Sequence, residues 1–92
     1  MGINQRYSID NDRITYRIID DEAVILDLDS CFYYNLNKTG TMVWRSLIEG
    51  KDLTRIIEEI SREHQVPQKT VANDVKAIIT EFKKEKLIEP ER

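Results

Sequence analysis

Residues 23–37 read AVILDLDSCFYYNLN, and this stretch holds two strand-like runs separated by a short polar break. The first run, residues 23–28, is apolar at alternate positions, and Asp29-Ser30 ends it. The second run, residues 31–36, is rich in phenylalanine and tyrosine, which favour strands. A break this short is typical of antiparallel neighbours joined by a tight turn. The stretch therefore predicts a hairpin.

A further strand is predicted just upstream, in residues 13–19. Apolar Ile14, Tyr16 and Ile18 alternate there with the residues between them, as in a strand with two different faces. The acidic triplet Asp20-Asp21-Glu22 then reads as a turn. Together the runs predict a three-stranded antiparallel meander.

After Asn37 the apolar spacing changes from two residues to three or four, which is the period of a helix. We expect Asn37 to cap a first helix that runs to about residue 49 and stops at Gly50. A second helix opens at Asp52 or Thr54. A third follows Pro67 and covers about residues 68–86.

Strands followed by helices predict an α+β fold: a three-stranded antiparallel sheet, then three helices, with the outline of a winged helix-turn-helix. We expect one domain over residues 13–88, in which Leu87 and Ile88 pack back on the helices. Residues 1–12 are expected to be a flexible N-terminal segment, and residues 89–92 a tail that frays.

Composition limits the classes of protein that fit. The chain has 92 residues, which is enough for one domain, and its net charge is −3 with mixed charges throughout. A nucleic-acid-binding protein usually has a basic face and a high pI instead. One cysteine, no signal-like N-terminus and no long apolar run favour a cytoplasmic protein.

The residues that catalysis requires are scarce. The chain has one histidine, His64, and one cysteine, Cys31, which lie far apart in the sequence and belong to no zinc-binding motif. Three glycines form no phosphate loop, and the acidic triplet lacks the spacing of a calcium loop. We therefore expect a binding module that is not an enzyme and has no cofactor and no metal.

The third predicted strand suggests where binding occurs. It is an edge of the meander, and edges normally carry charges or proline that prevent pairing with other chains. No charged residue and no proline occurs in Cys31, Phe32, Tyr33, Tyr34, Asn35 and Leu36. Either an extended peptide adds to this edge as a further strand, or a helix or a second copy of the chain covers it. The alternation leaves open which members of the strand face the core.

The third helix is the expected second wall of such a cleft. Its apolar band is wide, so most of the band packs on the other helices while its margin could line a groove. Asp74 flanks the band and could meet a peptide or simply face water. The residues of this wall are Val71, Asp74, Val75, Ile78 and Phe82.

Taken in order, several stretches resemble the coenzyme PQQ synthesis protein D family. These are residues 23–28, residues 33–37, Gly40 to Trp44, Glu49-Gly50, the helix of residues 53–60, Asp74-Val75 and Leu87-Ile88. The resemblance covers about residues 13–88. Cys31 and the double tyrosine are particular to this chain, so a relative's peptide preference does not carry over.

The resemblance implies a recognition element for precursors of ribosomally made, modified peptides. It implies that the leader of the precursor adds beside the third strand and lies against the third helix. It also implies a partner enzyme, which is a radical SAM protein or a lasso-type leader peptidase.

Two other functions fit parts of the pattern. In a winged-helix DNA-binding regulator, the exposed start of the third helix would read DNA through Gln68, Lys69, Thr70, Asn73 and Lys76. Asp74 and Glu81 interrupt that face. In a structural homodimer, two third-strand edges would pair across a twofold axis.

Overall fold

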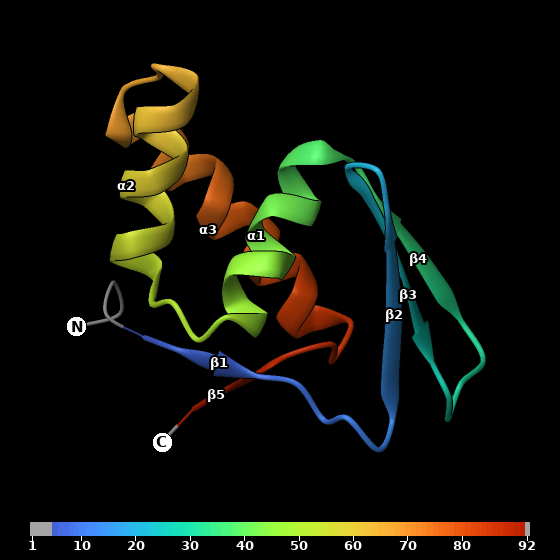
Figure 1. The fold of residues 1–92 in the computed structure, drawn as a ribbon. Helices are drawn as coiled ribbons and strands as arrows, with labels where there is room; N and C mark the ends of the chain where they lie inside the picture. The colour runs from blue at the N-terminus through green and yellow to red at the C-terminus, as the bar shows by residue number, and fades with distance from the viewer. Residues whose placement is uncertain (1–4, 92) are drawn as a thin grey trace.

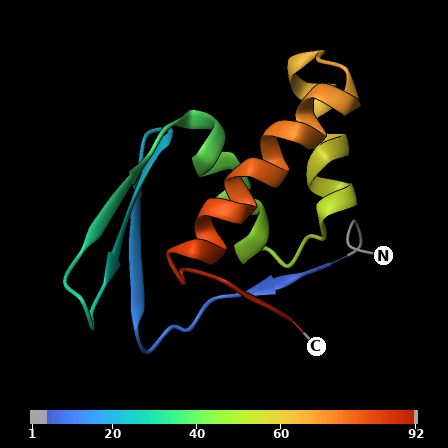
Figure 2. The ribbon, with the colours of Figure 1, turned by 180° about the vertical axis from the view of Figure 1, so that it is seen from behind.

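The computed structural model describes residues 5–91. Its sheet contains β2 (Ile14–Ile19), β3 (Glu22–Asp27) and β4 (Tyr33–Leu36), followed by α1 (Lys38–Ile48), α2 (Leu53–His64) and α3 (Gln68–Lys84). Two short strands, β1 (Tyr7–Ser8) and β5 (Glu89–Pro90), pair with each other near the ends of the chain. All three helices lie on one face of the sheet (Figure 1), and the reverse view agrees (Figure 2).

The sheet is antiparallel, with strand order β2-β3-β4, so the predicted α+β meander is confirmed. Ile14 and Ile25 are buried beneath the helices, whereas Ile19 and Tyr33 on the opposite side are well exposed. One face of the sheet therefore belongs to the core, and within residues 5–91 no helix lies against the other face.

The loop between β3 and β4 is longer than the sequence predicted. β3 ends at Asp27 rather than Leu28, and β4 begins at Tyr33 rather than Cys31. The carboxylate of Asp27 accepts hydrogen bonds from the backbone N–H groups of Asp29, at 2.9 Å, and Ser30, at 3.4 Å. Cys31 takes a left-handed conformation with φ of 65°, which a strand cannot contain. Cys31 and Phe32 therefore lie in the loop.

The helix boundaries follow from their caps. The Asn37 side chain accepts a hydrogen bond from the Gly40 N–H at 2.8 Å, and the Asp52 side chain accepts one from the Arg55 N–H at 2.9 Å. Asp52, rather than Thr54, is therefore the cap of α2. Gly50 stops α1 with a φ of 82°, a conformation that glycine adopts without strain.

The third helix ends at Lys84, two residues before the predicted end. Lys86 has a φ of 60°, and the N–H of Leu87 bonds the Phe82 carbonyl at 2.9 Å. The Lys86 N–H bonds the Lys83 carbonyl at 3.0 Å, which completes the usual two-bond helix stop. This stop turns Leu87 and Ile88 into the core, as predicted, and both are buried.

Trp44 of α1 joins the sheet to the last helix. Its side chain is fully buried and meets Tyr16 of β2 and Phe82 of α3 edge to face, with ring centroids 5.7 and 5.5 Å away. Such pairs add to the stabilisation that burial itself gives. The core is therefore one continuous layer between the inner face of the sheet and the helices.

The ends of the chain differ from the sequence prediction. Tyr7 pairs with Pro90 and Ser8 with Glu89, and the Glu91 N–H bonds the Arg6 carbonyl at 2.8 Å. Tyr7 is also buried in the core. Residues 89–91 are thus paired instead of frayed, and part of the N-terminal dozen contributes to the core. Residues 1–4 and 92, for which flexible ends were predicted, lie outside the described residues.

Candidate functional site

The open edge of the sheet is β4. The sheet order leaves β4 with β3 on one side and, within residues 5–91, with no strand on the other. Its four residues, YYNL, carry no charge and include no proline. The edge is therefore chemically suited to pairing with another extended chain.

The pairing pattern shows which backbone groups of β4 point outward. The Asp27 N–H bonds the Phe32 carbonyl at 2.9 Å, and Ile25 stands opposite Tyr34. Because alternate residues of an antiparallel strand face the same neighbour, the backbone groups of Tyr34 and Leu36 face β3. The N–H and C=O groups of Tyr33 and Asn35 therefore point to the open side.

The side chains of β4 alternate between the two faces of the sheet. Tyr34 and Leu36 are half-buried and pack against the core, whereas Tyr33 and Asn35 are exposed. Phe32 is 67% exposed and lies outside the strand. The structure thus decides a point that the sequence left open, since Tyr34 is the aromatic residue that faces the helices.

Tyr34 connects β4 to the end of α3. Its hydroxyl donates a hydrogen bond to the carboxylate of Glu85, the C-cap of α3, at 3.2 Å. Burial raises the pKa of Tyr34, and the hydrogen bond to Glu85 raises it further. The hydroxyl therefore stays protonated and keeps donating at neutral pH, which fixes β4 beside the C-terminal end of α3.

The predicted residues of α3 divide into two groups. Val71, Val75 and Phe82 are at most 4% exposed and belong to the core. Ile78 is half-buried at the margin of the core, and Asp74 is exposed. Of the predicted wall, Ile78 and Asp74 are therefore the side chains with accessible surface, while the other three belong to the core.

The model of the family described as coenzyme PQQ synthesis protein D matches residues 22–88, from the first residue of β3 to the end of the buried Leu87-Ile88 pair. That is 67 of the 92 residues. The chain belongs to the PQQ synthesis protein D family.

Two solved structures are similar to this family member. "TbiB1 in Complex with the TbiA(beta) Leader Peptide" is 31% identical, with a TM-score of 0.83, and the match covers 91% of this chain and 96% of that chain. "Lasso peptide synthetase B1 complexed with the leader peptide" is 22% identical, with a TM-score of 0.84, and the match covers 92% and 99%. The second likeness shows a shared fold. A comparison with curated proteins gave no match.

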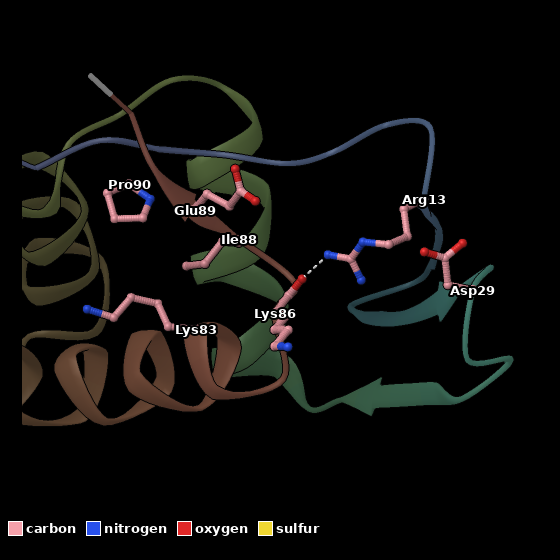
Figure 3. A pocket seen from close by; sticks show the side chains of 7 residues that line it. All are labelled: Arg13, Asp29, Lys83, Lys86, Ile88, Glu89 and Pro90. Carbon is pink, nitrogen blue, oxygen red and sulfur yellow. Dashed lines mark hydrogen bonds between the residues drawn. The ribbon is translucent and has the colours of Figure 1, made fainter.

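Arg13 is the centre of a small network of one ion pair and one hydrogen bond, which the sequence did not predict and which lies beside the end of α3 in this family member. Arg13 donates to Asp27 at 2.9 Å and also donates to the backbone carbonyl of Lys86. Figure 3 shows the guanidinium pointing toward that carbonyl. Arg13 and Asp27 lie 14 positions apart, and neither forms a motif, so only the fold brings them together.

The Asp27 carboxylate is stabilised in its charged form. Burial acts to raise its pKa, but the N–H groups of Asp29 and Ser30 and the charge of Arg13 outweigh burial and lower it. A charged Asp27 at neutral pH therefore holds the β3–β4 loop on one side and Arg13 on the other.

A hollow of about 610 Å³ lies next to this network at the end of α3 (Figure 3). Its charged lining side chains are of both signs: Arg13, Asp29, Lys83, Lys86 and Glu89. A smaller hollow of about 160 Å³ lies between the start of α1, the end of α2 and the start of α3. Its lining residues are Thr39, Met42, Ile60, His64, Val66, Val71, Asp74 and Val75. Both hollows are therefore lined by residues outside β4.

The two residues weighed for catalysis lie on different elements. Cys31 is exposed in the β3–β4 loop, and His64 is exposed at the last position of α2. Within residues 5–91 there is no cluster of three or more His, Cys, Asp or Glu side chains that could hold a metal ion. No helix in the described part of the chain is long and apolar enough to cross a membrane.

Proposed function

We propose that this chain binds the leader segment of a ribosomally made precursor peptide by strand addition to β4. The observation that carries the proposal is the uncharged, open edge of β4, with the outward backbone groups of Tyr33 and Asn35. A relative with 31% identity over nearly the whole chain has been solved in complex with a leader peptide, which supports the same role here.

In this proposal the backbone of β4 supplies affinity and the flanking side chains supply specificity. Leader side chains that point toward the helices meet Tyr34, Leu36, Ile78 and Asp74, above a floor of Val71, Val75 and Phe82. Leader side chains that point the other way lie beside Tyr33 and Asn35. Cys31 and Phe32 border the end of the groove at the β3–β4 loop.

The module works with a separate modifying enzyme in this proposal and performs no chemistry itself. It presents the bound leader to a radical SAM protein or to a lasso-type leader peptidase, in the cytoplasm. Family membership supports a role in the maturation of a peptide-derived product. The same open edge could instead pair with a second copy of the chain, and a mass that rises with protein concentration would reveal that homodimer.

An amide chemical-shift titration of the isolated chain tests the proposal. The ligand is the N-terminal segment of a short peptide encoded beside the gene, and a duplex DNA is the control. We expect shifts concentrated at Tyr33 and Asn35 and along the β4-facing side of α3, with none from DNA. Unmoved β4 amides, together with a DNA response at residues 68–76, would overturn the proposal in favour of a DNA-binding regulator.

A further inference from the structure

The charges of α3 are divided between two sides of the helix. Successive residues of a helix are rotated by about 100°, which brings Asp74, Ile78, Glu81 and Glu85 into an arc of about 60°. The lysines of the helix fall outside this arc: Lys69, Lys76, Lys83 and Lys84. One stripe of α3 therefore carries three carboxylates and one apolar residue, and no cation.

This stripe points toward β4 at one end and toward the start of α1 at the other. At one end the Glu85 carboxylate accepts a hydrogen bond from the hydroxyl of Tyr34, which lies on β4. At the other end Asp74 shares a hollow with Thr39 and Met42, which lie just after β4 in the first turns of α1. The stripe thus meets β4 at Glu85 and the start of α1, which follows β4, at Asp74, so Ile78 and Glu81 lie between these two points.

The carboxylates on this stripe have no salt-bridge partner in the described part of the chain. Asp74 and Glu81 are exposed, and neither forms a salt bridge with another residue in the range 5–91. Glu59 on α2 differs, because Lys51 at 2.7 Å and Arg55 at 3.0 Å neutralise it. The stripe thus carries carboxylates that form no salt bridge within residues 5–91.

We infer that the peptide which adds to β4 has a basic–x–apolar–x–basic pattern on the side that faces α3. This inference rests on the proposed strand addition and specifies its ligand. Same-side residues of a strand repeat every ~6.8 Å. Along α3, Ile78 lies ~6 Å from Asp74 and ~4.5 Å from Glu81, and long lysine or arginine side chains absorb the difference. The apolar residue then packs on Ile78, and the two basic residues pair with Asp74 and Glu81.

Two synthetic nine-residue peptides test the inference. One has Lys-Thr-Leu-Thr-Lys at its centre, the other has Glu-Thr-Leu-Thr-Glu, and both have threonine at the flanking positions. Binding is measured by amide shifts of the full chain at low salt. We expect the lysine peptide to shift Tyr33 and Asn35 and to bind at least about tenfold more tightly, as two exposed ion pairs in place of two repulsions would give.

Two double variants with equal changes in net charge isolate the role of the stripe. Asp74→Asn with Glu81→Gln removes two negative charges from the stripe and should bring the two affinities to within about threefold. Asn73→Lys with Thr80→Lys adds two positive charges, also seven residues apart, on the side of α3 away from β4. This control should keep the preference for the lysine peptide, because only long-range charge changes.

The outcomes separate the two proposals. If both peptides shift the β4 amides equally, or if the neutral double variant keeps the preference, the charge pattern is wrong while strand addition stands. If neither peptide shifts Tyr33 or Asn35, strand addition fails and the inference fails with it.

Discussion

The two edges of the one sheet are treated differently by the protein. β2 has Arg17 in mid-strand, and its start is covered by the chain itself, because the Ile14 N–H bonds the Asp10 carbonyl at 2.8 Å. β4 has neither a charge nor such a cover among the described residues. A protein that needed only to avoid aggregation would protect both edges. The difference is what the proposed addition of a ligand strand to β4 requires.

Removing one outward N–H from each edge in turn should show whether the two edges differ in function. Asn35→Pro deletes an N–H on the open side of β4 and leaves the bonds to β3 in place. We expect leader binding to weaken by about tenfold or more, since a peptide carbonyl left without its partner costs about 1–3 kcal/mol. Titration calorimetry with the leader peptide measures the loss.

Ile18→Pro is the matched change on β2. The bond from the Leu28 N–H to the Arg13 carbonyl, at 2.8 Å, sets the alternation so that the Ile18 N–H points away from β3. This variant should bind the leader as the wild type does, provided that thermal melting shows it folded. Equal losses in both variants would mean that the two edges do not differ in function.

Asp27 bonds both Arg13, which lies next to β2, and the loop that leads into β4. Acid should weaken these bonds, which connect the two edges of the sheet. The pKa of Asp27 is lower in the folded protein than the usual carboxyl pKa of 3.8, so Asp27 contributes its full stabilisation above pH 3.8. This stabilisation is lost as the pH falls through the lower pKa of the folded state. We expect Asp27→Asn to lower the melting temperature at neutral pH, with a difference from wild type that shrinks below pH 3.8. A difference that is constant with pH would contradict this role of a charged Asp27.

The smallest effect concerns where the open edge begins. Cys31 has a φ of 65°, which costs a residue with a side chain about 1–2 kcal/mol and costs glycine almost nothing. Cys31→Gly should therefore raise the free energy of unfolding by about 0.5–1 kcal/mol, after the extra chain entropy of glycine is subtracted. Urea unfolding measures the gain. Leader binding should not change, and a large loss would place Cys31 within the groove.

The sequence was enough to predict the open edge at β4, because the absence of charged residues in one short segment is a local property of composition. The absence of charge in YYNL and the arginine in β2 can be read without a structure. Alternation defined two possible faces for β4, but it could not tell which one is inside. That choice depends on the contact of Tyr34 with Glu85, 51 positions away, and so on the packing of α3.

The loop boundary and the chain ends were harder to predict for physical reasons. Cys31 leaves the strand pattern because Asp27 folds the loop with its side chain, a bond that overrides the strand preference of the neighbouring aromatics. The two-residue strands β1 and β5 are too short to show a period. Val71, Val75 and Phe82 were candidate site residues because a wide apolar band does not reveal which of its members are covered.

The pairing of β1 with β5 has a consequence for the order of folding. Tyr7 and Pro90 are 83 positions apart, so forming this ladder closes a loop of nearly the whole chain and costs more entropy than any hairpin in the sheet. Contacts of such long range form late in folding. A ladder of two residues forms few hydrogen bonds to offset the entropy lost in closing the loop. The Glu91 amide, bonded to Arg6, should therefore exchange its hydrogen with solvent sooner than the amides of the β2–β3 hairpin. The chain then opens first at its joined ends, while the sheet that carries the ligand edge stays intact.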